Sequence, residues 1–241
     1  MNEYAIKSFA GFAEPLCSWS HLAGALVFAL LSIPLMKRAI RCEQPLGALN
    51  HTFRIAGVGL YCFSVVTLLV ISGFYHSLGF NTPARADLLR WDYAAIFLLI
   101  AGSFTPPCAI LLRGVGRIAA LASIWTIAFV GIAVRSIYRS PLTGWEGYSL
   151  YIAFGSFGII GVILIWRKYG ATFVEPLVLG GVAYLSGAAV QLAFQPELIP
   201  GLVGPHEILH VAVLVGIACN WRFVWRIASG VREWEGRDLR S

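Results

Sequence analysis

The stretch from Ile55 to Phe74 reads IAGVGLYCFSVVTLLVISGF and contains no residue that is charged at neutral pH. A helix needs about 20 apolar residues to cross the hydrocarbon core of a bilayer, and this stretch has that length. A second uncharged stretch of similar length runs from Tyr93 to Leu112. The two stretches predict a pair of membrane-spanning helices.

Apolar runs with little or no charge recur along the rest of the chain and are separated by short connections rich in Lys, Arg and Pro. The five further runs are Trp19–Met36, Ile118–Val134, Tyr148–Trp166, Leu177–Phe194 and His206–Trp221. We therefore predict an all-α integral membrane protein, a bundle of seven transmembrane helices. Residues 1–241 are predicted to form a single domain, with an N-terminal segment at 1–17 and a charged C-terminal tail at 222–241.

The composition agrees with a membrane protein. Of the 241 residues, 30 are Lys, Arg, Asp or Glu, and 58% are hydrophobic. A soluble domain carries about twice this share of charge, so a cytosolic enzyme, a disordered chain and a nucleic-acid-binding module are all disfavoured. The expected partners are membrane lipids, and no nucleic acid is expected. The five scattered cysteines form no CxxC pair, and we interpret them as small buried side chains.

Basic residues divide unequally between the two sides that seven spans define. The side of the N-terminus carries five of them, and the side of the C-terminus carries thirteen, including five arginines of the tail. Cytoplasmic loops carry an excess of Lys and Arg. The count predicts an N-terminus outside and a cytoplasmic C-terminus. The five on the N-terminal side are Lys7, Arg85, Arg90, Arg135 and Arg139.

Polar residues at the ends of three spans suggest a metal site. Ser72 and His76 lie four residues apart at the end of one span, Asp92 lies at the start of the next, and His206 and His210 lie four apart at the start of the last. Residues at i and i+4 share a helix face. All three sets fall on one side of the membrane, at one depth. Three neutral imidazoles with an open position suit a zinc ion that activates water.

In this hypothesis His76, His206 and His210 are the metal ligands. Asp92 holds the water or accepts its proton, and Ser72 donates a hydrogen bond beside the site. The segment His206-Glu207-Ile-Leu-His210 also matches HExxH, in which the glutamate is the base of a metalloprotease. No suitable third ligand follows His210, so an intramembrane metalloprotease is the weaker alternative.

Two other histidines are interpreted separately. His51 lies in a basic connection, and we interpret it as a hydrogen-bonded helix end. His21 begins the first span on the same side as the predicted site, which leaves a role near the site open.

At these motifs the chain resembles the hemolysin III family, the bacterial branch of the progestin-and-adipoQ receptor superfamily, and more distantly the alkaline ceramidases. The motifs are Glu14 with Ser18 and His21, then Ser72–His76, the run from Asp92 to Pro106, and His206–His210. The resemblance implies that the three histidines bind one zinc ion, that Asp92 holds the water at the zinc, and that Ser72 lies beside it. It also implies a bacterial inner (plasma) membrane.

The chain departs from the family pattern at two places. It has Cys17-Ser18 where bacterial relatives often have Asn-Ser, and Asp92-Tyr93 where they often have Asp-His. The receptor branch is described with a cytoplasmic N-terminus, which is opposite to the charge count here.

The function expected from these residues is a zinc-dependent hydrolase of lipid amides, with a ceramide-like substrate. The alternative is a non-enzymatic protein, receptor-like or membrane-perturbing, in which zinc is structural. An ion or proton pathway that uses the same residues is a third hypothesis.

Overall fold

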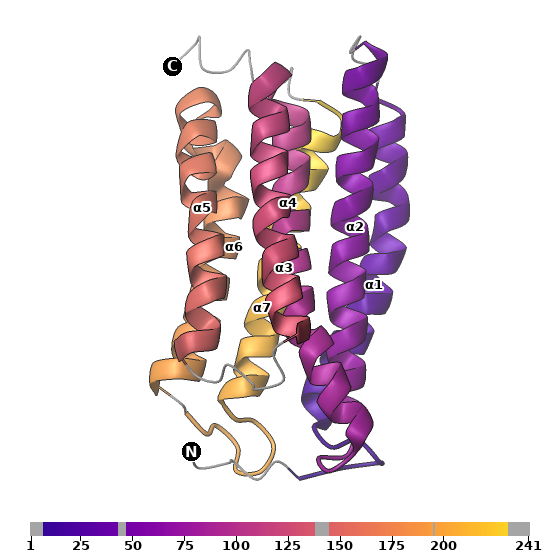
Figure 1. The fold of residues 1–241 in the computed structure, drawn as a ribbon, viewed down its shortest axis with the longest axis vertical. Helices are drawn as coiled ribbons and strands as arrows, with labels where there is room; N and C mark the ends of the chain where they lie inside the picture. The colour runs from indigo at the N-terminus through magenta and orange to yellow at the C-terminus, as the bar shows by residue number, and fades with distance from the viewer. Residues whose placement is uncertain (1–6, 43–46, 138–144, 195, 231–241) are drawn as a thin grey trace.

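Seven long α-helices run antiparallel through the described part of the chain in a computed structural model (Figure 1). The structure describes residues 7–42, 47–137, 145–194 and 196–230. The helices are α1 (Pro15–Ile40), α2 (Ala48–Ser77), α3 (Pro83–Leu111), α4 (Gly114–Ile137), α5 (Trp145–Tyr169), α6 (Ala171–Ala189) and α7 (Pro205–Ala228). A short π-helical turn, Val190–Phe194, follows α6. All seven helices are long and apolar enough to cross a membrane, which confirms the predicted all-α fold.

The helices extend beyond the runs that hydropathy marks. α2 begins seven residues before Ile55, and α7 continues past Trp221 to Ala228, into the predicted tail. The predicted N-terminal segment likewise ends earlier, because α1 begins at Pro15. Residues 1–6 of that segment and 231–241 of that tail lie outside the described residues.

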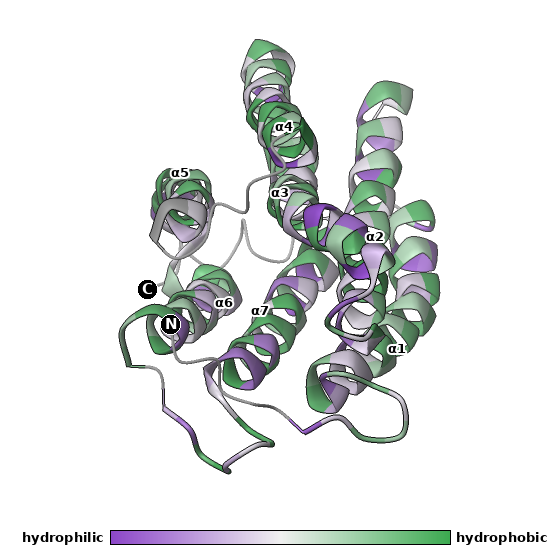
Figure 2. Ribbon diagram, turned by 60° about the horizontal axis from the view of Figure 1, so that its bottom comes forward, coloured by the Kyte–Doolittle hydropathy of each residue, from purple (hydrophilic) through white to green (hydrophobic). Residues whose placement is uncertain are grey.

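The core lies mainly between α1, α2, α3 and α7. α2 packs against α1 and α3, while α7 packs against α6 and α1. Figure 2, which turns the end near the N-terminus forward, shows α5 standing at the edge of the bundle. α4, α5 and α6 leave large apolar side chains exposed, among them Phe129, Phe157 and Val182. Such faces suit the hydrocarbon of a bilayer, in which apolar side chains need not be buried.

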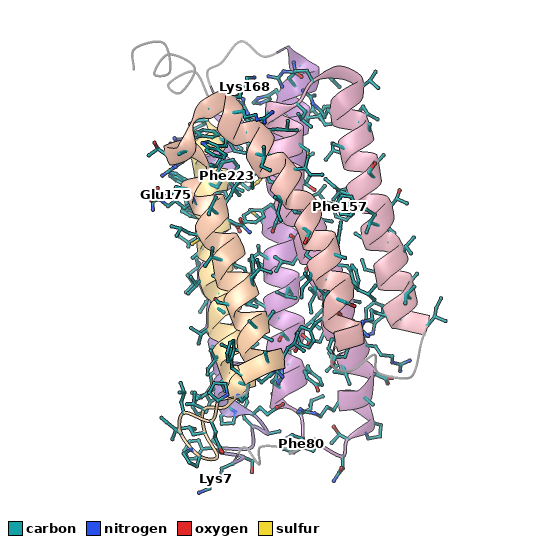
Figure 3. All side chains as sticks on the ribbon, turned by 90° about the vertical axis from the view of Figure 1, so that its left-hand side faces the viewer. Lys7, Phe80, Phe157, Lys168, Glu175 and Phe223 are labelled. Carbon is teal, nitrogen blue, oxygen red and sulfur yellow. The ribbon has the colours of Figure 1, made fainter. Side chains whose placement is uncertain are left out.

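Three helices that start at the same end of the bundle have a proline in their first turn: α1, α3 and α7. A proline here loses no hydrogen bond, because the first N–H groups of a helix have no partner within it. Figure 3 marks this end by Lys7 and Phe80, and the opposite end by Lys168. The prolines thus fix helix starts at the end where the predicted site residues lie.

Candidate metal centre

The three predicted histidine ligands meet at this end of the bundle. His76 lies in the last turn of α2, and His206 and His210 lie in the first two turns of α7. The Nε2 atom of His206 is 3.4 Å from Nε2 of His76 and 3.1 Å from Nε2 of His210. Helix periodicity places His206 and His210 on one face, and the packing of α2 on α7 supplies His76.

The spacing of these nitrogens fits a tetrahedral metal ion. With Zn–N bonds of about 2.0–2.1 Å, two ligand nitrogens of a tetrahedral zinc site lie about 3.3 Å apart. The separations of 3.4 Å and 3.1 Å are close to that value. A cation between the three rings would satisfy three lone pairs at once, whereas a hydrogen on His206 would have to be shared between two neighbours. The donor chemistry and the geometry therefore fit zinc.

Cys17 belongs to the same group, although we interpreted it from the sequence only as a small buried side chain. Its Sγ atom and one ring nitrogen of each of the three histidines all lie within 4.8 Å of one another. Cys17 lies in the first turn of α1 and is fully buried. The signal that could have found it is spacing, because Cys17 stands four residues before His21 and three after Glu14.

Glu14 orients His76. Its Oε2 atom lies 2.8 Å from Nδ1 of His76 and also accepts a hydrogen bond from Arg85. Two backbone contacts hold the segment there, since the N–H groups of Ala13 and Glu14 bond to the carbonyl oxygens of Ser77 and His76. Burial alone would raise the pKa of Glu14, but the bonds to His76 and Arg85 lower it to about 2. An ionised Glu14 keeps the proton of His76 on Nδ1 and leaves Nε2 free to bind a metal.

Arg85, which in the sequence only helps to predict membrane orientation, makes structural contacts near the site. It lies in the first turn of α3, where it donates to the carbonyl oxygens of Leu78 and Tyr75 as well as to Glu14. Its guanidinium group also stacks on the rings of Tyr75 and Phe80. These contacts tie the connection between α2 and α3 to the start of α1.

Asp92 and Ser72 lie together beside the histidines. The carboxyl group of Asp92, on α3, lies near the hydroxyl of Ser72. His76 also lies close enough to Asp92 for their charges to interact. Ser72 is buried and Asp92 half-buried. Asp92 is not among the four residues whose donor atoms converge.

His21 contacts the site, and His51 does not. The ring of His21 stacks on that of His210, with centroids 3.9 Å apart and planes 19° from parallel. His21 is buried, and neither of its ring nitrogens has a hydrogen-bond partner among the described residues. His51 lies at the opposite end of the bundle, in the first turn of α2. The role that the sequence left open for His21 thus becomes a contact with the ring of His210.

Glu207 is occupied by structural contacts. One oxygen accepts a hydrogen bond from the backbone N–H of Gly204, 2.9 Å away, which caps the start of α7. The other oxygen lies 3.2 Å from the sulfur of Cys17. Glu207 is also buried. These contacts favour a supporting role over that of the general base in an HExxH protease.

Comparison with known proteins identifies the family. A family model described as haemolysin-III related matches residues 9–221 of the chain, which includes all seven helices for most of their length. The chain belongs to the haemolysin-III-related family. The resemblance to the hemolysin III family inferred from the motifs is thereby confirmed.

Relatives of this haemolysin-III-related chain occur in plants and bacteria. It is 31% identical to the heptahelical transmembrane protein ADIPOR2 of Oryza sativa subsp. japonica over 190 residues, covering 68% of this chain and 82% of the relative. It is 30% identical to Hemolysin-3 of Bacillus cereus over 191 residues, covering 79% of this chain and 82% of the relative. It is 27% identical to a Hemolysin-3 homolog of Bacillus subtilis (strain 168), covering 78% and 84%. The protein is an integral membrane protein with seven spans.

Proposed function

We propose that this protein is a zinc-dependent hydrolase of lipid amides, with ceramide-like substrates, embedded in the membrane by its seven helices. The observation that carries the proposal is the convergence of the three histidines, with Nε2 of His206 3.4 Å from that of His76 and 3.1 Å from that of His210, and with Asp92 and Ser72 nearby. A carboxylate beside a metal that has an open position is the arrangement used by hydrolases that activate water.

Each side chain has a role that follows from its contacts. When bound, zinc would polarise the amide carbonyl and lower the pKa of water. Asp92 takes the proton of the attacking water on its carboxylate. Ser72 donates its one hydroxyl proton toward Asp92 before the reaction, and it can donate to the carbonyl oxygen once Asp92 has taken the proton of the water. Glu14, held by Arg85, fixes the ring of His76.

A lipid substrate fits the position of the site. The histidines lie near one end of apolar helices, so an acyl chain could extend along the hydrocarbon while the amide reaches the metal. The charge count supports an external N-terminus and a cytoplasmic C-terminus in a bacterial inner membrane, with the site near the outer face. Reporter fusions at each terminus would test that orientation.

The decisive experiment uses the full-length protein, purified in detergent, with a panel of N-acyl lipids. We expect about one zinc per chain and release of fatty acid. Asp92→Asn should keep zinc and lose hydrolysis, because it removes the proton acceptor but no ligand. Asp87→Asn is the matched control, since Asp87 is an exposed acid at the same end that pairs with Arg90. Absence of fatty acid release with every lipid, or full activity in Asp92→Asn, would refute the proposal.

A second candidate is a non-enzymatic protein, receptor-like or membrane-perturbing, in which the metal is structural. It is favoured by the origin of the donor atoms, which come from α1, α2 and α7, so that one ion would tie three helices together. In this case the lytic or signalling activity survives in Asp92→Asn and depends on the ligands alone.

A further inference from the structure

Cys17 is the one non-histidine member of the group of converging donor atoms. Its sulfur and the three histidine nitrogens form one group within 4.8 Å, and the thiol is completely buried. Three neutral imidazoles leave one corner of a tetrahedron empty, and a thiolate is one of the preferred zinc ligands. The described residues therefore offer four protein donors and not three.

The position of Cys17 is fixed by the structure on both sides. Pro15 starts α1 one half-turn before it, and Ser18, the next residue, bonds through its hydroxyl to the carbonyl oxygen of Gly73, 2.8 Å away. A Cβ atom on Gly73 would come within 2.6 Å of Leu22, so α1 and α2 approach closely here. Glu207 holds the sulfur from the side of α7 at 3.2 Å. Cys17 thus lies at the junction of the two helices that supply the histidines.

Once a divalent metal is bound, charge favours a thiolate at this position. A dication held by three neutral rings would keep a charge of +2 in a poorly solvated site, where uncompensated charge is costly. Coordination to a metal deprotonates a thiol outright. A thiolate from Cys17 would reduce the charge to +1, and the proton that the thiol now donates toward Glu207, 3.2 Å away, would have to leave the site when the metal binds.

We propose that Cys17 is the fourth protein ligand of the metal, so that the resting site is a closed set of one cysteine and three histidines. This rests on metal binding as given in the proposed function, but not on hydrolysis. The open position on which the proposed hydrolysis depends would then form only when the thiolate leaves the metal or when the metal accepts a fifth ligand.

X-ray absorption spectroscopy of the zinc-loaded wild-type protein tests this without any variant. We expect one sulfur neighbour at about 2.3 Å together with nitrogen neighbours at about 2.0–2.1 Å. A shell of nitrogen and oxygen alone would overturn the proposal and leave the zinc site intact. Failure to bind any metal would overturn the proposed function as well, so the two failures are distinguishable.

Cobalt substitution gives the matched mutational test. The Co(II)-loaded wild type should show the near-ultraviolet charge-transfer band of a thiolate ligand, and Cys17→Ser should lose it. Cys62→Ser is the control, because Cys62 is buried in the core of α2, fourteen residues and about 21 Å along the helix from His76. Retention of the band in Cys17→Ser, or its loss in Cys62→Ser, would contradict the assignment.

Discussion

Replacing Glu14 by Gln tests how the site holds its metal. The substitution keeps an oxygen acceptor for Nδ1 of His76, now 2.8 Å from a carboxylate, but removes the negative charge. It also leaves Arg85 without its ion-pair partner Glu14. The first effect acts on the basicity and orientation of His76, and the second acts on the stability of the fold.

The size of the effect on metal affinity follows from the hydrogen bond. A bond to a charged group contributes about 1.5–3 kcal/mol and a neutral bond about 0.5–1.5 kcal/mol, so the substitution costs about 1–1.5 kcal/mol. That is a loss of about five- to fifteenfold in zinc affinity, at the low end of the range of about 10–100-fold typical of such supporting groups. Loss of the ion pair with Arg85 affects the metal-free and metal-bound forms alike, so it appears as a lower Tm and largely cancels in the affinity.

Competition with a chromophoric chelator, on protein in detergent, measures the affinity. Asp87→Asn makes the same change of charge on an exposed residue of α3, and it should leave zinc binding unchanged. If Glu14→Gln binds zinc within about twofold of the wild type, then the contact with Nδ1 does not support the ligand, and the reasoning is wrong.

Two further predictions concern the ligands and the packing. His206→Ala should abolish stoichiometric zinc binding and lower the Tm of the zinc-loaded protein, whereas His51→Ala, at the other end of α2, should change neither; metal analysis with thermal unfolding decides. Gly102→Ala should lower stability by about 1–3 kcal/mol, because its Cβ would lie 1.9 Å from the hydroxyl of Ser64 where α2 and α3 touch. Gly155→Ala has nothing within 4 Å of its Cβ, and it should be neutral or slightly stabilising. Equal loss of stability in both glycine variants would show that close packing of α2 on α3 is not what matters.

The seven helices could be predicted because apolar runs report the hydrocarbon thickness directly. The helix ends could not be predicted, because a helix can continue into the polar zone without an apolar signal. α7 shows the reason, since its last turns contain Arg226, which donates to the carbonyl oxygen of Thr172 at the start of α6. The hydropathy pattern assigns Arg226 to the charged C-terminal tail. In the structure Arg226 belongs to α7, and its contact with α6 stabilises the last turns of that helix.

The candidate site was predictable where it depends on spacing within one helix. His206 and His210 share a face by periodicity, and the structure brings His76 to them. Cys17 and the ion pair of Glu14 with Arg85 depend on how three helices meet, which a single sequence does not encode locally. In the sequence, Arg85 is only one of the basic residues that indicate membrane orientation. In the structure its side chain is buried and pairs with Glu14.

The electrostatics of the helix starts explain why acids surround the ligands. The N-terminus of a helix carries about half a positive charge, which opposes a metal cation placed beside it. Here α1 is preceded by Glu14 at its N-cap, and α7 has Glu207 in its first turn. Each acid stabilises the start of its own helix, and each contacts a donor residue, His76 or Cys17. Among the described residues Glu14 is paired with Arg85, while Glu207 has no ion-pair partner. A bound cation would supply the charge that Glu207 lacks, so metal binding and the stability of the start of α7 should rise and fall together.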